Sequence, residues 1–444
     1  MTLGEIFKAY DVRGPYPDAL DERIAEAIGR AVAVHLRPAR ALVGHDMRRS
    51  SPSLAAALIE GLAAQGIDVT FIGLASSPLV YFAGRGYDAS IVVTASHNPL
   101  PDNGMKICEA DALPIGGDSG LFEVRRLVEQ GTFPAAARRG QVVEAAPRGA
   151  FVDASLRALE ARRSFRVVVD AGNGIGGPDY AELMKRDTPL RIVPLYFEPD
   201  DRFPHHHPNP LDHATLDDLR RAVLAERADL GLALDGDADR CVFVDETGEI
   251  VPADLATALM AQDVLAHRPG ASILYDVRSS RAVAEEIERG GGRAVESRVG
   301  HAYMKRTLAE IGGAFGGELS GHYYFDPPSF AENTLRALFA VVNLLGRRGT
   351  TLSEAVRPLR RYAQSGEINV RVPAVAPVLA RLLAAFPGGA VSRLDGLKVS
   401  FDDWWFNARP SNTEPLLRLV IEGNDASTMQ RRTAEVLALV REGA

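Results

Sequence analysis

The sequence predicts an α/β protein with three similar domains, each built on a mixed α/β sheet, followed by a smaller α+β domain. The 444 residues suffice for roughly three or four domains at about 150 residues each. A short apolar strand, a polar or glycine-rich loop and a helix alternate along most of the chain, which is typical of parallel strands in α/β sheets. We therefore expect domains at 1–150, 151–250, 251–365 and 366–444.

The first domain is expected to begin with an amphipathic helix. Apolar residues at every fourth position indicate its buried face, namely Leu20, Ile24, Ile28, Val32 and Leu36. Buried strands are expected at 41–44, 69–72 and 91–93. Between the first two strands, Ser51 is expected to cap a helix that has Pro52 at its first position and Gly66 as its stop.

The second and third domains repeat this alternation, and the last domain departs from it. The second domain is expected to have strands at 166–169, 191–195, 230–234 and 241–244. The third is expected to have strands at 272–275, 293–296 and 314–317. In the last domain, strands at 367–372, 396–400 and 416–421 flank helices such as 378–385. This change of pattern predicts the α+β arrangement.

Composition and charge exclude several classes of protein. Hydrophobic residues make up 46% and charged residues 24%, so the chain is not disordered as a whole. The net charge of −8 opposes a general nucleic-acid or anionic-membrane surface. The N-terminus lacks the regions of a signal peptide, and no apolar run approaches the roughly 20 residues that span a bilayer. The sequence therefore predicts a soluble cytoplasmic protein.

Asp235, Asp237 and Asp239 form the motif with the clearest chemistry. Carboxylates at alternate positions, with small residues between them, turn their oxygens toward one hard divalent cation. A solvated acidic turn and an EF-hand calcium loop, whose last ligand would be Glu246, are the alternatives. Because Arg240 stands where the EF-hand needs glycine and a strand precedes the motif, we favour Mg²⁺ shared with a phosphate oxygen.

Ser96 lies in the loop 94–99, directly after the strand at 91–93. Its small and polar neighbours leave the hydroxyl exposed, to attack or to carry a phosphoryl group. His97 allows a serine-hydrolase interpretation, but loop neighbours do not generally meet as nucleophile and base, and the G-x-S-x-G elbow is absent. Alone, the loop is typical of a turn ended by Pro99. Beside a carboxylate triplet that calls for phosphate, phosphoryl transfer is favoured.

Two further loops offer groups that suit a sugar phosphate. Glycine pairs surround Glu318 and Ser320, so the backbone can approach a ligand whose hydroxyls these side chains would bind. Near the C-terminus, the guanidinium of Arg409 is followed by further donors, namely Ser411, Asn412, Thr413 and Arg418. Such a set meets the needs of a dianionic phosphate without a metal. Each loop alone is also typical of an ordinary turn.

The remaining candidates are individually weak. Arg13 could reach an anion, and a buried core histidine would explain His301 equally well. His205, His206 and His207 are consecutive and lie among prolines, which favours a rigid loop over a zinc site. Cys108 and Cys241 are expected to be small buried hydrophobes. Arginine greatly outnumbers lysine, so Lys106 and Lys305 hint at positions that need a compact ammonium group.

The polar motifs share one position in the predicted sheets. The loops at Ser96, at Asp235 and at Glu318 all follow strands, and ligands of open α/β sheets bind beyond the carboxyl ends of strands. One cleft, fed by several domains, is therefore expected.

As a set, these motifs resemble the α-D-phosphohexomutase family, in particular its bacterial phosphomannomutase/phosphoglucomutase members. The resemblance covers the whole chain in order, through AYDVRG, TASHNP with NGMK, FPHHHPNP, DGDADR, GELSGH and RPSNTEP. It implies a four-domain, heart-shaped molecule around a central cleft. It also implies interconversion of hexose 6-phosphate and hexose 1-phosphate, of mannose and/or glucose, through a phosphoserine enzyme and a hexose 1,6-bisphosphate, which also acts as activator.

The resemblance assigns roles residue by residue. Ser96 matches the phosphoryl carrier, and its phosphoserine oxygen joins Asp235, Asp237 and Asp239 as Mg²⁺ ligands. Positions near the transferred phosphoryl group or the proton transfer are matched by Lys106, Arg13, Arg240, His301 and His322. Substrate contacts are matched by Tyr10, Glu318, Ser320, Arg409, Ser411, Asn412, Thr413 and Arg418.

Two segments depart from the family pattern. Arg278 stands where the family commonly has lysine, and 331–334 replaces an acidic Asp-Gly helix start. Phosphoglucosamine mutase, a Mg²⁺-dependent sugar phosphatase and a sugar-phosphate sensor remain alternatives at this point. The expected partners are hexose phosphates, without nucleic acid or membrane, and the expected state is a monomer, with an oligomer left open.

Overall fold

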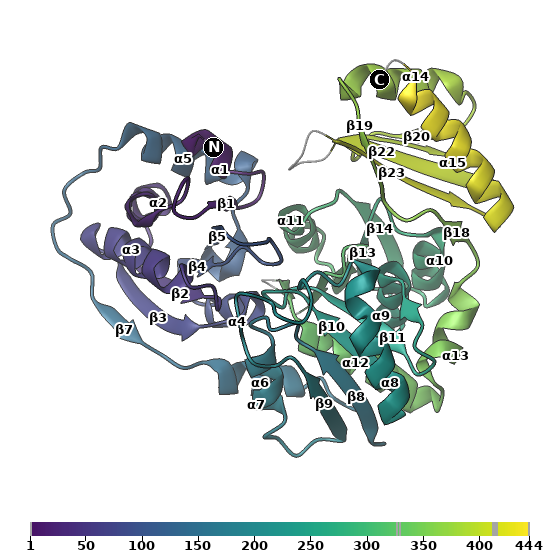
Figure 1. The fold of residues 1–444 in the computed structure, drawn as a ribbon, viewed down its shortest axis with the longest axis horizontal. Helices are drawn as coiled ribbons and strands as arrows, with labels where there is room; N and C mark the ends of the chain where they lie inside the picture. The colour runs from purple at the N-terminus through teal and green to yellow at the C-terminus, as the bar shows by residue number, and fades with distance from the viewer. Residues whose placement is uncertain (1, 326, 328–329, 411–415, 443–444) are drawn as a thin grey trace.

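The computed structural model describes residues 2–325, 327, 330–410 and 416–442. They form four β-sheets that follow one another along the chain, each covered by helices (Figure 1). In Figure 1 the first sheet lies on the left and the last at the upper right, with the second and third below and between them, so the sheets follow an arc. The predicted fold class is confirmed. The limits at 150, 250 and 365 stay predictions.

The first sheet has the strand order β1-β5-β4-β2-β3-β7, with β6 paired to β5. Its centre is parallel, and β5 runs antiparallel to both β4 and β1. The strands are β1 (Val12–Pro15), β2 (Arg40–His45), β3 (Asp68–Leu74), β4 (Ala89–Val93), β5 (Asp102–Glu109), β6 (Leu113–Pro114) and β7 (Val142–Glu144). The helices are α1 (Leu3–Ile6), α2 (Glu22–Leu36), α3 (Ser51–Ala64), α4 (Ser77–Ala83) and α5 (Leu121–Gln130), with 3-10 turns η1 (Ala110–Ala112) and η2 (Gly117–Ser119).

Two helix starts differ from the expectation. Helix α2 begins at Glu22 after the Asp21 cap, so Leu20 is buried but lies before the helix. Helix α3 is preceded by Ser50 as its cap residue, and Ser51 is already helical. The Ser51 hydroxyl donates instead to Asp46 at 2.5 Å, because Asp46 lies buried at the end of β2 and needs donors.

The second and third sheets are also mixed, with orders β12-β11-β10-β8-β9 and β14-β13-β15-β16-β17. The second contains β8 (Phe165–Asp170), β9 (Leu190–Leu195), β10 (Leu230–Leu234), β11 (Cys241–Asp245) and β12 (Ile250–Val251). The third contains β13 (Ser272–Asp276), β14 (Arg293–Ser297), β15 (Phe315–Gly317), β16 (Tyr323–Phe325) and β17 (Ala331–Glu332). Their helices are α6 (Arg148–Leu156), α7 (Gly177–Leu183), η3 (His213–Leu216), α8 (Asp217–Glu226), α9 (Ala253–His267), α10 (Arg281–Arg289), α11 (His301–Ile311), α12 (Thr334–Arg348), α13 (Leu352–Val356) and η4 (Arg357–Leu359).

The last sheet is antiparallel, as an α+β domain requires. Its order is β18-β23-β22-β21-β20, with β19 paired to β23. The strands are β18 (Ala363–Gln364), β19 (Ile368–Arg371), β20 (Ala390–Ser392), β21 (Leu397–Ser400), β22 (Trp404–Pro410) and β23 (Leu416–Gly423), packed against α14 (Val375–Ala385) and α15 (Ala426–Arg441).

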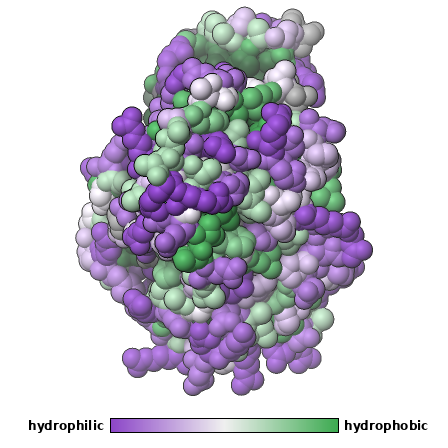
Figure 2. Space-filling model, turned by 90° about the vertical axis from the view of Figure 1, so that its left-hand side faces the viewer, coloured by the Kyte–Doolittle hydropathy of each residue, from purple (hydrophilic) through white to green (hydrophobic). Residues whose placement is uncertain are grey.

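The apolar cores do not coincide one to one with the sheets. The largest cluster is continuous from the α4 side of the first sheet through the second and third, and includes Val92, Leu232 and Phe315. The last domain has a core of its own, whose buried members all lie between Val378 and Val440. The face shown in Figure 2 is mostly polar, with smaller apolar areas between charged side chains. Among the described residues, no helix is both long and apolar enough to cross a membrane.

Candidate active site

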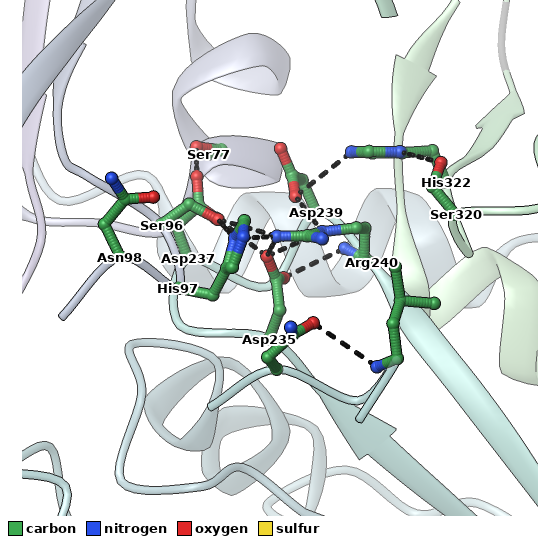
Figure 3. A network of polar contacts seen from close by, with 12 residues as sticks. Ser77, Ser96, His97, Asn98, Asp235, Asp237, Asp239, Arg240, Ser320 and His322 are labelled. Atoms are coloured by element: carbon green, nitrogen blue, oxygen red, sulfur yellow. Dashed lines mark hydrogen bonds and ion pairs between the residues drawn. The ribbon is translucent and has the colours of Figure 1, made fainter. Parts of the chain in front are cut away.

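Loops from three sheets meet at one place (Figure 3). Ser96 follows β4, the aspartate motif joins β10 to β11, and the glycine-rich loop joins β15 to β16. The Ser96 hydroxyl donates to Asp235 Oδ2 at 2.8 Å, and Asp239 Oδ1 lies 3.5 Å from His322 Nε2. Arg240 and His322 also form an isolated β-bridge. The predicted convergence of these loops at strand ends is therefore what the structure shows.

Ser96 sits in a tight left-handed turn. Its φ is 52°, a value that residues other than glycine rarely adopt. Only 3% of the residue is exposed. Its amide donates to Thr94 Oγ1 at 2.9 Å. This turn also brings the hydroxyl 3.1 Å from Nδ1 of His97, so the expectation that the two neighbours do not meet is wrong. Arg240 donates to both, to Ser96 Oγ at 3.1 Å and to His97 Nδ1.

Arg48 fixes the Ser96 loop, and the sequence analysis missed it. The side chain is fully buried and donates to three backbone carbonyls, of Ser96 at 2.8 Å, Asn98 at 2.6 Å and Asp102 at 2.8 Å. Asp46 lies 3.4 Å away as its counter-charge. A signal was available, because Arg48 follows the predicted strand at 41–44 just as Ser96 follows its own strand.

The backbone of the aspartate motif touches the serine loop. A Cβ at Gly236 would lie 2.4 Å from the carbonyl oxygen of Ser96, so any larger residue would push the two loops apart. Ser77, at the start of α4, joins the same contact by donating to Asp237 Oδ2 at 2.5 Å. The first and second domains are thus in direct contact beside the candidate nucleophile, Ser96.

Asp235, Asp237 and Asp239 have the properties of a cation site. All three are buried, and one carboxylate oxygen from each lies within 4.8 Å of the others. The Oδ1 atom of Asp237 is buried without a hydrogen-bond partner among the described residues, whereas Asp239 Oδ1 faces His322 Nε2 at 3.5 Å. Burial raises the pKa of Asp235, and the two neighbouring carboxylates add to this effect. Clustered buried carboxylate oxygens fit a hard divalent cation.

Lys106 partly balances this charge. It projects from β5, and its Nζ contacts the carboxylates of Asp237 and Asp239. Burial alone would lower the pKa of Lys106, but the two carboxylates raise it above its usual value, so the ammonium stays charged. Glu246, the last ligand required by the EF-hand alternative, instead accepts hydrogen bonds from Ser353.

His322 and His301 line the site from the third domain. His322 Nδ1 lies 2.8 Å from Ser320 Oγ and 3.5 Å from Glu318 Oε2. Burial alone would lower the pKa of His322, but the Asp239 carboxylate raises it. His301 lies at the start of α11, and its buried Nε2 has no hydrogen-bond partner among the described residues. A satisfied core histidine, the alternative for His301, does not describe this environment.

Residues near the N-terminus approach from the first domain. Arg13 donates to Asn98 at 2.7 Å and to Asp11 at 2.5 Å, which places it beside the serine loop. The ring of Tyr10 packs edge-on against His301, with ring centroids 5.6 Å apart. Burial lowers the pKa of His301 well below its usual range, and the positive charges of Lys305 and Lys106 add to this. His301 is therefore neutral at pH 7.

Glu318 connects the sugar loop to its surroundings. Its Oε1 accepts from the Gly300 amide at 2.8 Å, and its Oε2 accepts from the Tyr324 hydroxyl at 2.5 Å. In the same loop, the Leu319 amide donates to Asp276 at 2.8 Å. Asp276 in turn binds Arg278, whose guanidinium comes within 4.0 Å of Glu318. The lysine-to-arginine departure therefore lies at the site itself.

Arg409 and Arg418 lie on neighbouring strands of the last sheet, and both contact Glu367. The sequence analysis missed Glu367, which lies between β18 and β19. The predicted phosphate donors Ser411, Asn412 and Thr413 lie outside the described residues.

The segment 331–334, the second departure from the family pattern, forms strand β17 and the start of helix α12. Asn333 caps α12 by accepting from the Arg336 amide at 3.1 Å. Glu332 pairs with Lys305 at 2.5 Å, both fully buried, and the Lys305 ammonium lies 3.6 Å from the ring centroid of Tyr81 in the first domain. Both lysines singled out by their rarity, Lys106 and Lys305, are thus buried in ion pairs. Cys108 and Cys241 are buried free thiols, as expected.

The histidine tract forms part of a loop that packs within the second domain. His205 Nδ1 lies 2.7 Å from Asn173 Oδ1, and His206 Nε2 lies 3.0 Å from Asp170. The ring of Tyr196 stacks on His205 with centroids 3.7 Å apart. These contacts explain His205 and His206 through loop packing, whereas His207 contacts the backbone of His97 in the serine loop.

The site combines a buried serine hydroxyl, three clustered carboxylates and several fixed cations. This arrangement, supplied by separate α/β domains, is typical of enzymes that transfer phosphoryl groups. The comparisons with known proteins specify the class. Family models described as phosphoglucomutase/phosphomannomutase alpha/beta/alpha domains I, II and III match residues 4–135, 149–248 and 252–362. The model of the C-terminal domain of the same family matches residues 367–439.

Individual relatives agree over the whole chain. A phosphomannomutase of Salmonella montevideo is 39% identical over 448 residues, covering 98% of each chain. A solved phosphoglucomutase/phosphomannomutase family protein from Burkholderia thailandensis has a TM-score of 0.92 at 31% identity, covering 100% of this chain and 98% of that one. The fold alone is shared with an Aspergillus fumigatus N-acetylphosphoglucosamine mutase solved with GlcNAc-6P and magnesium, which has a TM-score of 0.62 at 16% identity and covers 99% and 97%.

The chain therefore belongs to the phosphoglucomutase/phosphomannomutase family of α-D-phosphohexomutases. It is a hexose phosphate mutase, an isomerase-type enzyme.

Proposed function

We propose that this mutase interconverts the 6- and 1-phosphates of mannose and/or glucose through a phosphorylated Ser96 and a hexose 1,6-bisphosphate. The observation that carries the proposal is the environment of the Ser96 hydroxyl. It lies 2.8 Å from a member of the buried aspartate triad and 3.1 Å from the Arg240 guanidinium. A hydroxyl between a cation site and a fixed positive charge suits the transfer of a phosphoryl dianion.

In the proposed reaction, the bond between phosphorus and Ser96 Oγ breaks as a new bond forms to the free hydroxyl of the hexose phosphate. The hydroxyl proton passes to a neutral base, and we assign this role to His301, whose Nε2 has no partner among the described residues. Lys106, Arg240 and Arg13 hold positive charge around the moving group. The bisphosphate then turns end for end and returns its other phosphate to Ser96.

We propose Mg²⁺ as the cation, held by Asp235, Asp237, Asp239 and an oxygen at Ser96. When bound, Mg²⁺ would neutralise charge on the phosphoryl group during its transfer. One carboxylate oxygen from each aspartate lies within 4.8 Å of the others, which supports a shared cation. The solved Aspergillus fumigatus mutase was obtained with magnesium and a sugar phosphate, which supports the assignment.

Substrate recognition is proposed for the groups of the third and fourth domains. Glu318 and Ser320 would bind sugar hydroxyls, with Tyr10 beside them. Arg409 and Arg418, together with the predicted donors at 411–413, would bind the phosphate that is not reacting. A cytoplasmic location, a monomeric state, the activator role of the bisphosphate and the absence of nucleic-acid and membrane partners stay predictions.

Two measurements test the function. Intact-mass analysis of the purified protein should show a species heavier by about 80 Da, the mass of one phosphoryl group, mapped to Ser96. Ser96→Ala should abolish mutase turnover while sugar-phosphate binding is retained, because binding relies on other loops. Assays with mannose, glucose and glucosamine phosphates side by side identify the substrate. Near-normal turnover of a contaminant-free Ser96→Ala protein would refute the proposal.

A further inference from the structure

Glu367 is a single carboxylate surrounded by three guanidinium groups. It accepts from Arg278 at 3.1 Å, from Arg409 at 3.3 Å and from Arg418 at 3.0 Å. Arg278 follows the third-domain strand β13, whereas Arg409 and Arg418 lie on β22 and β23 of the last domain. Glu367 itself lies between β18 and β19, two strands that both pair with β23 of the last sheet. One anion therefore joins cations from both sides of a domain boundary.

Glu367 is not the only carboxylate near these guanidinium groups, since Asp395 also acts on Arg409. Arg278 has a second counter-charge in Asp276, but Arg409 is only 3% exposed and its Nε has no hydrogen-bond partner among the described residues. Burial raises the pKa of Glu367, yet the three arginines hold it below its usual value, so the carboxylate is ionised. Burial lowers the pKa of Arg409, and the charge of Arg278 adds to this. A phosphate that bound to Arg409 and Arg418 would therefore need the same donors that Glu367 now uses.

We propose that Glu367 is an internal competitor for the site of the non-reacting phosphate: it occupies the arginines when no substrate is bound and gives them up to the phosphate of the sugar. This inference rests on the function proposed above, in which Arg409 and Arg418 bind that phosphate. A carboxylate and a phosphate present similar oxygens to a guanidinium, so they compete for the same donors. The competitor is covalently tethered and is always present at the site.

The competition has a use in this reaction. The bisphosphate must leave the arginines before it turns, and the loss of an anionic partner is costly for a buried guanidinium such as that of Arg409. A tethered carboxylate supplies the replacement partner at the moment of release. Glu367 therefore weakens substrate binding and shortens the time that the intermediate remains attached.

The alternative is that Glu367 merely holds the arginines in position for the phosphate. The two roles predict opposite signs for Glu367→Gln, which keeps the size and removes the charge. If Glu367 positions the arginines, its replacement should weaken the binding of phosphate. If Glu367 competes with phosphate, its replacement should tighten the binding of phosphate.

The test is calorimetric titration of the purified full-length protein with inorganic phosphate. Glu367→Gln should lower the Kd for phosphate by about tenfold, which corresponds to arginines that are open in about one tenth of the wild-type molecules. Both KM and kcat of the mutase should fall together, because release slows. The matched control is Glu285→Gln, which removes a carboxylate on α10 that pairs with Arg361 and not with the three arginines. It should change neither quantity.

Further variants keep the test decisive. If Glu367→Gln fails to fold, Glu367→Asp shortens the reach to the arginines and should show the same change in smaller degree. In an Arg409→Ala background, Glu367→Gln should no longer tighten phosphate binding. An unchanged or raised Kd in the Glu367 variants overturns the proposal. If the wild type has no mutase activity but Glu367→Gln still tightens phosphate binding, the function fails and the competition stands.

Discussion

The charged side chains around Ser96 nearly neutralise one another. The three aspartates are opposed by Lys106 and Arg240, all of them buried or nearly so. A divalent cation would change the sign of this local sum from negative to positive. The site would then attract a phosphoryl dianion, because desolvated charges interact strongly in a medium of low polarity. Metal binding is thus expected to control both binding of the anion and its chemistry.

Removal of single carboxylates tests this balance. Asp237→Asn and Asp239→Asn should each lower mutase activity by orders of magnitude, with only partial recovery at high Mg²⁺, since the amide keeps the volume but removes a charge. Activity is measured against Mg²⁺ concentration after treatment with EDTA. Asp68→Asn, at a surface pair with Arg138, is the control and should leave the Mg²⁺ dependence unchanged. Full wild-type activity after exhaustive EDTA treatment would contradict the metal assignment.

At the level of single residues, the sequence predicted groups that form a local pattern. The aspartates could be found because their alternate spacing follows an apolar strand, and Ser96 because it ends another. Arg48 and Glu367 were not predicted as site residues because each contacts neighbours that are remote in sequence. The contact between Ser96 and His97 depends on a left-handed turn that spacing alone does not reveal.

The serine loop is an element whose shape depends on one buried side chain. Arg48 donates to three carbonyls of the loop, and no other side chain in the described part of the chain donates to all three. Lysine keeps the charge, but its single ammonium lacks the planar fork of donors. The loop would then lose its defined shape around Ser96.

Arg48→Lys should therefore lower kcat by about one to two decades while KM changes little, because a small displacement of the reacting group is costly and the distal contacts are intact. Steady-state kinetics, with the phosphorylated fraction of Ser96 from intact mass, give the comparison. Arg49→Lys, at the neighbouring exposed position, should behave as the wild type. A change in KM alone would show that the loop does not depend on Arg48.

Among the elements, the strands that the sequence missed are informative. Strand β5 contains Asn103 and Lys106, and β22 contains Asn407 and Arg409, all buried. Their polar side chains interrupt the apolar pattern by which buried strands are recognised. They are buried because each has partners in the site or in an adjacent loop. Strands with functional side chains are therefore harder to predict than structural ones, whereas the sequence does predict the mostly apolar strands β10 and β4.

For the whole molecule, the four domains must act on one substrate with two ends. The proposed distal phosphate site lies on the last domain, whereas Ser96 and the aspartates lie on the first two. The same arginines would serve the sugar in both orientations. Any defect there should affect both directions of the reaction equally.

Arg409→Ala removes up to two charge-assisted hydrogen bonds, each worth about 1.5–3 kcal/mol. The value of kcat/KM should fall by roughly two to four decades in both directions. Hydrolysis of phosphorylated Ser96 by water should change far less, since water has no distal phosphate. Arg431→Ala, at an exposed position on α15, is the control. Impairment of one direction only, or equal loss of mutase activity and hydrolysis, would contradict the distal role.

The division of the apolar cores sets how the molecule comes apart. One continuous cluster passes through the first three domains, so loosening any of them exposes apolar surface in its neighbours. The cluster of the last domain contains no buried member from outside residues 378–440. In terms of native-state energetics, we expect the last domain to open as a separate cooperative unit, at a lower free energy than that of global unfolding. A rotation of the last domain, which would let the bisphosphate turn, is expected to break charged contacts with the third domain, such as that between Arg278 and Glu367. The buried apolar clusters would stay intact.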